Sequence, residues 1–182
     1  MKVDESNAQQ ISKDGDSPSW SSDGNQIIFV STQNKISSIC MMNKDGSSLK
    51  CIKDSADPLY SPRMSPDGSK IFYLFDSGEN QIGIILNLKD NKKNQIFDSP
   101  FTEWLSSWPN DKMITLTTKS SGSVSGYMYI IDLNNKNFNK ILGNINGLTT
   151  LSNPNGKLIL YNDNNLSLYI YHTDTRNSGV LG

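Results

Sequence analysis

One short phrase recurs four times along this chain of 182 residues and constrains its fold more than any other feature. The copies are SWSSDGNQIIFV (19–30), MSPDGSKIFYL (64–74), SWPNDKMITL (107–116) and SNPNGKLILY (152–161). Aligned on Ser22, Pro66, Pro109 and Pro154, they follow one another at spacings of 44, 43 and 45 residues. A fixed period of this length indicates a repeat architecture, in which each unit is one supersecondary element.

The phrase combines a tight turn with a strand. In the second copy Pro66 presets φ, Asp67 bonds to its own backbone, and Gly68 accepts a positive φ. The run IFYL that follows is rich in the β-branched and aromatic residues typical of strands. The later copies carry Asn110-Asp111 and Asn155-Gly156 in place of Asp-Gly, a mild change because Asn and Asp tolerate the same turn conformations.

Each repeat has room for four strands. A short segment precedes the turn, an apolar strand follows it, and two further strands are separated by polar loops. Four strands per roughly 44 residues predict an all-β protein, a β-propeller built of four-stranded antiparallel blades. Helical repeats of this period are excluded because the apolar runs are short and are interrupted every few positions by Asn, Gly, Ser and Pro. The predicted blades are approximately 17–56, 57–99, 100–143 and 144–182.

The repeat resembles that of the TolB-like, or WD-repeat-like (WD40-like), β-propeller family over 17–181. The matching positions are Pro18, Trp20, Ser21, Asp23, Gly24, Ile27, Phe29 and Val30 in the first blade, and Pro62, Ser65, Pro66, Asp67, Gly68, Ile71 and Tyr73 in the second. The segment 41–52 resembles the family's hairpin between the third and fourth strands of a blade. The resemblance implies a non-catalytic module that recruits a protein or peptide partner and lies in the periplasm or elsewhere outside the cytoplasm.

The number of blades raises the question of closure. Propellers of this family usually close with six or more blades, whereas four are predicted here. Residues 1–16 are expected to form a strand of a preceding blade or a closing strand. Either Ala8–Ile11 completes the last blade and closes a small ring, or the chain is a sector of a larger propeller with open edges that allow self-association. We favour the sector.

Composition excludes several partners. The net charge is −1 and the isoelectric point about 5.8, so no bulk electrostatic attraction to nucleic acid or to an anionic membrane is expected. The longest apolar run, Ile82–Leu88, is the size of a strand rather than a transmembrane segment. The segment 1–10 lacks the apolar core of a signal peptide.

Catalytic and metal motifs are absent from the sequence. The single histidine, His172, is interpreted as a strand residue at the surface or between blades. Asp23 and Asp67 recur at the same blade position, which indicates turn chemistry rather than a catalytic pair. No G-x-S-x-G, H-E-x-x-H or paired C-x-x-C motif occurs, and neither 14–17 nor 162–165 has the spacing of a calcium loop. We therefore predict no enzyme activity, no metal and no cofactor.

Cys40 and Cys51 flank a predicted hairpin turn. If Met42 faces Leu49 across that hairpin, the two cysteines are directly opposite and close enough for a disulfide. A reducing compartment or another register would leave them as two thiols. The sequence leaves these alternatives open.

Four residues are candidates for partner contact: Tyr60, Arg63, Trp104 and Trp108. They lie near first strands of blades, and the loops entering those strands gather around the central channel of a propeller. Aromatic rings beside an arginine suit peptide or glycan contact, but packing between blades is the interpretation that we favour for each of them. Packing is the expectation for Trp20, which occupies a repeat position. An alternative function for the whole chain is the substrate-gating part of a larger peptidase or glycan-processing enzyme.

Overall fold

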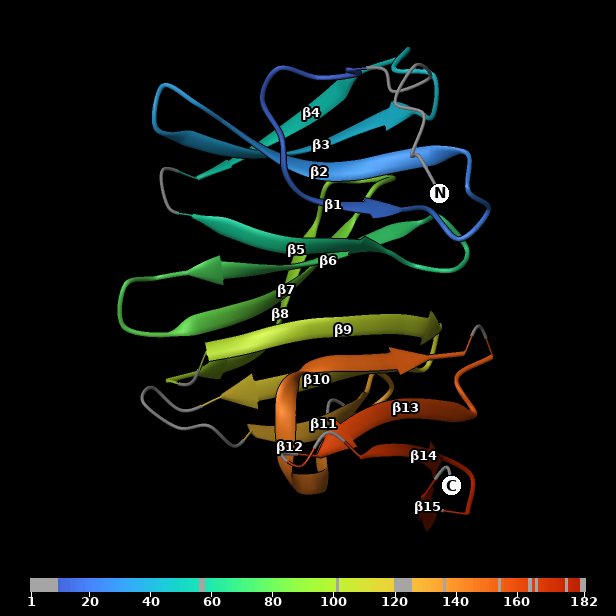
Figure 1. Cartoon of the computed structure of the whole chain (residues 1–182). Coiled ribbons are helices and arrows are strands. Elements are labelled where there is room, and N and C mark those ends of the chain that lie inside the picture. The colour runs from blue at the N-terminus through green and yellow to red at the C-terminus, as the bar shows by residue number, and fades with distance from the viewer. Residues whose placement is uncertain are drawn as a thin grey trace.

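The computed structural model describes residues 10–55, 58–100, 102–119, 126–135, 137–153, 155–163, 165, 167–175 and 177–180. Every regular element in these residues is a strand (Figure 1). The first sheet contains β1 (Asp16–Trp20), β2 (Gln26–Gln33), β3 (Ile36–Asn43) and β4 (Lys50–Ser55). The second contains β5 (Leu59–Met64), β6 (Lys70–Asp76), β7 (Gln81–Asn87) and β8 (Lys93–Ser99). Both are antiparallel and ordered as in the chain, as expected for blades.

The third and fourth blades are continuous in one seven-stranded sheet. Its strands are β9 (Thr102–Asn110), β10 (Met113–Lys119), β11 (Gly126–Asp132), β12 (Asn137–Ser152), β13 (Leu158–Asp163), β14 (Leu168–His172) and β15 (Asn177–Val180). The 16 residues of β12 pair with β11 through their first part and with β13 through their last part. β12 is thus the fourth strand of one blade and the first strand of the next, and it bends sharply between them (Figure 1).

The recurring phrase folds into a hydrogen-bonded turn between the first two strands of a blade. In the second blade the Ser65 hydroxyl donates to Asp67 Oδ1 at 2.6 Å and accepts from the Lys70 N–H at 2.9 Å. Gly68 has φ of 72°, which suits a residue without a Cβ. Ser21 and Asp23 repeat these contacts in the first blade. In the fourth blade the Asn153 and Asn155 side chains accept the matching N–H groups, so the sequence prediction of this turn is confirmed.

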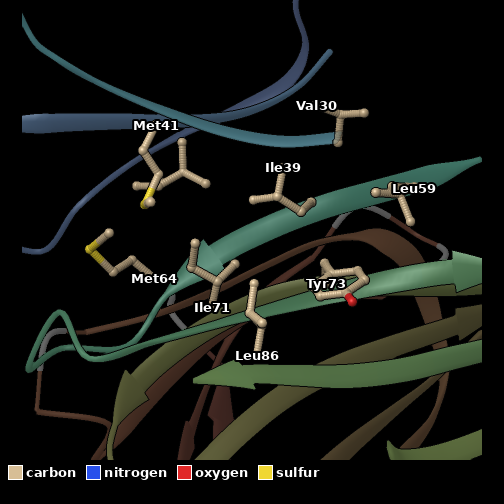
Figure 2. Close-up of a cluster of buried hydrophobic side chains, with 9 residues drawn as sticks. Val30, Ile39, Met41, Leu59, Met64, Ile71, Tyr73 and Leu86 are labelled. Atoms are coloured by element: carbon tan, nitrogen blue, oxygen red, sulfur yellow. The ribbon is translucent and has the colours of Figure 1, made fainter. Parts of the chain in front are cut away.

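Each blade has two apolar sides because side chains alternate along a strand. We call the side towards the next blade in the chain the forward face and the side towards the preceding blade the rear face. The forward face of the first blade packs on the rear face of the second in one buried cluster (Figure 2). Its members are Ile28, Val30, Ile39 and Met41 from the first blade and Leu59, Met64, Ile71, Tyr73 and Leu86 from the second.

Two further clusters continue this stacking. Phe72 and Leu74 on the forward face of the second blade pack with Ile114 and Leu116 of the third. Met128 of the third blade packs with Ile159, Tyr161 and Tyr171 of the fourth. Contacts between strands therefore link each blade to the next one along the chain. The first and last blades lie at opposite ends of this row (Figure 1).

The segment before β1 lies on the rear face of the first blade. Gln10–Gly15 has no strand, and a Cβ added to Gly15 would come within 3.2 Å of the Phe29 ring. Ile11 lies beside Gly46 in the β3–β4 turn. Ala8 and Gln9 are outside the described residues, so the pairing expected for Ala8–Ile11 stays a prediction. No helix in the described part of the chain has the length and apolar character needed to cross a membrane.

Candidate binding surface

The first strands of successive blades lie side by side, as expected around the axis of a propeller. β1 contacts β5, β5 contacts β9, and β9 contacts β12. Serine hydroxyls join them: Ser19 Oγ donates to the Pro62 carbonyl at 2.6 Å, and the Ser107 and Ser152 hydroxyls are 2.6 Å apart. This row of inner strands is the rigid support for any contact residue near the axis.

A β-bulge in β5 sets the direction of two candidate residues. Ser61, directly before a proline, has φ of 49°, and the register with β6 shifts between Tyr60 and Arg63. Tyr60 is opposite Leu74 and Arg63 is opposite Phe72, so both belong to the forward face although they are three residues apart. Ser17, 44 residues earlier, has φ of 50° at the matching bulge in β1.

Tyr60 is half-buried against the cluster of the second and third blades. Burial raises the pKa of its hydroxyl, and the nearby carboxylates of Asp76 and Asp16 raise it further. Asp16 belongs to β1 and Asp76 ends β6, so carboxylates from two blades contribute to the raised pKa of one tyrosine. Arg63 is also half-buried, which lowers its pKa, and its Nη1 donates to the Pro62 carbonyl at 3.0 Å.

The two tryptophans whose side chains are described differ in burial. Trp108 is only 7% exposed and packs in the same cluster as Phe72, which favours packing between blades over contact with a partner, although it also borders a cleft between the second and third blades. Trp104 lies opposite Thr117 in the β9–β10 register, but its side chain is outside the described residues. Trp20, expected between blades, is 60% exposed because it belongs to the rear face of the first blade, where no blade in the described part of the chain packs.

The described residues hold no group of three or more His, Cys, Asp or Glu side chains suited to a metal. His172 is exposed on β14, where it pairs with Leu158 of β13 on one side and Asn177 of β15 on the other. The carboxylates of Asp23 and Asp67 accept hydrogen bonds within their own turns. The hydroxyls of Ser21 and Ser65 are the main groups that lower the pKa values of these two carboxylates. These contacts account for the recurrence of the two aspartates in structural terms.

Cys40 and Cys51 are joined by a disulfide. They are directly opposite each other in the β3–β4 register. This is the register expected from the sequence if Met42 faces Leu49 across the hairpin. Cys40 is fully buried and Cys51 is exposed. The bridge ties the third and fourth strands of the first blade together.

Two clefts of about 360 Å³ and 260 Å³ open at blade junctions. The first lies between the second and third blades and the second between the third and fourth, and both include Asn134. Asn87, Asn94 and Ile96 in one cleft correspond to Asp132, Asn139 and Ile141 in the other, each 45 residues later. Because equivalent positions form both clefts, we attribute them to the divergence of stacked blades rather than to one specific ligand.

Acidic side chains gather on one side of the molecule, a feature that was not predicted from the sequence. The β2–β3 and β6–β7 loops emerge on the left in Figure 1, and the turns after β1 and β5 on the right. We call the first side, with the strand ends that meet it, the loop face. It carries the acidic side chains Asp14, Asp16, Asp76, Glu79, Asp98 and Asp163 against the cations Lys13 and Lys35 among the described residues. On the opposite side the turns mix both signs, as in Lys44-Asp45 and Asp111-Lys112. Assigning each charged residue to a loop or a turn of its repeat would have revealed this.

No protein-family model matches the chain. A 67-residue stretch is 36% identical to the Tol-Pal system protein TolB of Wolbachia pipientis subsp. Culex pipiens (strain wPip), covering 36% of this chain and 16% of that protein. The structure of TolB from Acinetobacter baumannii superposes with a TM-score of 0.66 at 24% identity, over 89% of this chain and 41% of that one. The fold is that of a TolB-like β-propeller.

Other propellers share the arrangement. The oligogalacturonate lyase of Vibrio parahaemolyticus superposes with a TM-score of 0.68 at 14% identity, over 95% of this chain and 56% of the lyase. The chain spans less than two thirds of each of these proteins. At these identities the structural likeness establishes the fold, and it does not carry over the activity of either protein.

Proposed function

We propose that this TolB-like chain is a non-catalytic interaction module that binds a protein or peptide partner through its loop face. The observation that carries the proposal is the acidic character of the loop face, to which β1 contributes Asp16 and β6 contributes Asp76, and where both carboxylates add to the raised pKa of the half-buried Tyr60. A rigid sheet scaffold with loops gathered on one side is a common basis for partner recognition. The resemblance to TolB supports a protein partner.

The charge of the loop face favours a basic segment in that partner. Among the side chains that the structure describes, six acidic ones against two lysines give this side a negative potential, although the whole chain has a net charge of only −1. A lysine or arginine of the partner would gain from the carboxylates of Asp16 and Asp76 and from the face of the Tyr60 ring. Nucleic acids and anionic membranes are themselves negatively charged, so the negative loop face disfavours both as partners.

The disulfide supports a location outside the cytoplasm. Disulfides persist in oxidising compartments such as the bacterial periplasm and are rare in the cytosol. The Cys40–Cys51 bridge is therefore consistent with the periplasmic or extracytoplasmic setting that the TolB resemblance implies.

A titration with defined peptides tests the proposal. The probes are a labelled decapeptide alternating lysine with glycine and its glutamate counterpart, followed by fluorescence anisotropy at low ionic strength. We expect the lysine peptide to bind and the glutamate peptide not to bind. The double variant Asp16→Asn/Asp76→Asn should weaken binding roughly five- to tenfold, since each exposed ion pair contributes up to about 1 kcal/mol.

Asp45→Asn is the matched control because Asp45 lies in a turn on the opposite side, where its carboxylate accepts from the Ser47 hydroxyl and N–H. This variant should bind the lysine peptide as the unchanged chain does. Equal weakening by both variants would mean that attraction is spread over the whole surface, and equal binding of both peptides would contradict the proposal.

The alternative is a substrate-gating part of a larger peptidase or glycan-processing enzyme. The likeness to the V. parahaemolyticus oligogalacturonate lyase supports it. It predicts either a catalytic domain elsewhere in the polypeptide or turnover by this chain. Cleavage of an oligogalacturonate or of a peptide substrate by the purified chain, lost on substitution of one acid near the inner strands, would favour this alternative.

A further inference from the structure

One buried residue sets the cleft between the second and third blades apart from the equivalent cleft at the next junction. The divergence of stacked blades opens both clefts, but the repeat is broken at Trp108. Ser21, Ser65 and Asn153 hold its position in the other blades, where each accepts the backbone N–H five residues later and so closes its turn. An indole has a donor and no acceptor, so Trp108 cannot take this role.

The indole N–H of Trp108 is buried without a hydrogen-bond partner. Trp108 is 7% exposed and forms part of the cleft wall, and its Nε1 is paired with no acceptor. Buried polar groups in folded proteins are nearly always paired, with protein or with ordered water. Packing with Phe72 accounts for the ring of Trp108 and not for its N–H. An acceptor atom supplied from outside the chain would complete this residue.

Three asparagine amides border the same cleft. Within the described residues, no hydrogen bond joins the side-chain amide of Asn94 or of Asn134 to another group. The side-chain oxygen of Asn87 accepts from the Lys89 N–H, which leaves the NH₂ group of Asn87 for a ligand. An amide offers both a donor and an acceptor, as a hydroxyl does. These side chains therefore suit a ligand that carries several hydroxyl groups.

The remaining residues of the cleft favour a neutral ligand. Its charged side chains are Lys70 and Asp111, whose charges are opposite, so neither an acid nor an amine is selected. Ile85, Ile96 and Leu133 supply apolar surface on which the C–H groups of a sugar ring can pack. The volume of about 360 Å³ lies near the lower end of the range of about 300–1,000 Å³ typical of small-molecule sites. A single sugar ring is the neutral, hydroxyl-rich ligand of this size.

We propose that the cleft between the second and third blades binds a neutral monosaccharide unit. An oxygen of the sugar accepts from the Trp108 N–H, and the amides of Asn94 and Asn134 bond to its hydroxyl groups. The site is separate from the loop face and does not depend on the function proposed for that face. Lys70 begins β6 and Asn87 ends β7, so the cleft lies on the opposite side of the molecule (Figure 1).

Nuclear magnetic resonance of the ¹⁵N-labelled full chain tests this. The indole N–H of Trp108 gives its own cross-peak, which is identified by its absence from the spectrum of Trp108→Phe. Glucose, galactose and mannose are titrated separately up to high millimolar concentration, with glucuronate as the acidic comparison. We expect at least one neutral sugar to move the Trp108 cross-peak along a saturating curve, and glucuronate to bind several-fold more weakly. A cross-peak that no neutral sugar moves, or equal binding of glucuronate, would overturn the proposal.

A pair of equivalent asparagines separates this site from the rest of the surface. Asn94→Ala should weaken binding of the same sugar about five- to tenfold, through the loss of hydrogen bonds to its hydroxyls. Asn139→Ala is the matched control, since Asn139 is also exposed and holds the same place in the other cleft. It should leave binding unchanged, and thermal unfolding by circular dichroism should show both variants folded. Equal weakening by the two variants, or no effect of Asn94→Ala, would contradict the assigned site.

Discussion

Ser22 and Pro66, 44 residues apart in sequence, are joined by a hydrogen bond in which the Ser22 hydroxyl donates to the Pro66 carbonyl oxygen over 2.7 Å. It connects the turn of the first blade to the equivalent turn of the second. Three residues before Ser22, Ser19 makes a second such bond to Pro62. Adjacent blades are therefore aligned by polar contacts at the inner strands, in addition to their apolar clusters.

Removing this contact should weaken the pairing of the first two blades. We expect Ser22→Ala to lower the free energy of unfolding by about 0.5–1.5 kcal/mol, the usual net contribution of one hydrogen bond. Urea unfolding followed by tryptophan fluorescence measures it. Ser22→Thr keeps the hydroxyl and should stay within about 0.5 kcal/mol of the unchanged chain. An alanine variant as stable as the threonine variant would contradict the role given to this bond.

Two tryptophans should respond differently to truncation. Trp108→Ala should cost about 3–5 kcal/mol because it leaves a cavity between the second and third blades. Trp20→Ala should cost less than about 1 kcal/mol because its ring is 60% exposed. Denaturant unfolding gives both values. Similar costs for the two variants would argue that a blade covers the rear face of the first blade.

The disulfide should stabilise the first blade. Cys40 and Cys51 are 11 residues apart, and closing a loop of that size contributes roughly 2–3 kcal/mol in the chain-entropy account. Reductant should lower the stability of the unchanged chain by this amount and leave a Cys40→Ala/Cys51→Ala variant unaffected. Alkylation without reductant followed by mass spectrometry checks the bridge itself: two labelled thiols would show that it is not formed.

The turn aspartates should make stability depend on acid pH. The Ser65 hydroxyl and then the Ser69 N–H hold the pKa of Asp67 down to about 2, from its usual 3.8. A carboxyl with a lowered pKa in the folded state stabilises above its unfolded pKa, and this contribution is lost as the pH falls towards 2. Asp67→Asn should therefore be less stable than the unchanged chain at pH 5 and equal to it near pH 2.

The carboxylate of Asp67 is exposed, so solvent screening limits the difference at pH 5 to below about 1 kcal/mol. Urea unfolding of both proteins across this pH range measures it. A difference that grows on acidification would contradict the assigned contacts.

The repeat could be predicted because its chemistry is local. Ser65, Asp67 and Gly68 form their turn from neighbouring atoms alone, and the strand after it is marked by its own residues. The register that sets Cys40 opposite Cys51 follows from the position of one hairpin turn in the same way.

Burial was harder to predict because it depends on what packs against a blade. Trp20 and Met64 occupy equivalent positions, yet Met64 is 8% exposed and Trp20 is 60% exposed, since only Met64 has a preceding blade of this chain against it. The position of Trp108 beside a turn made it a candidate for partner contact, but the second blade packs against its side chain. The continuity of β12 also escaped prediction, because this one strand crosses the expected blade boundary at 143/144 and pairs first with β11 and then with β13.

The central claim is that four blades stack in chain order through three apolar interfaces. Nuclear Overhauser contacts between labelled methyl groups test it most directly. The account predicts contacts between Val30 and Leu59, between Leu74 and Leu116, and between Met128 and Ile159, one pair for each interface. Absence of these contacts, or contacts that join the first blade to the fourth in their place, would contradict it.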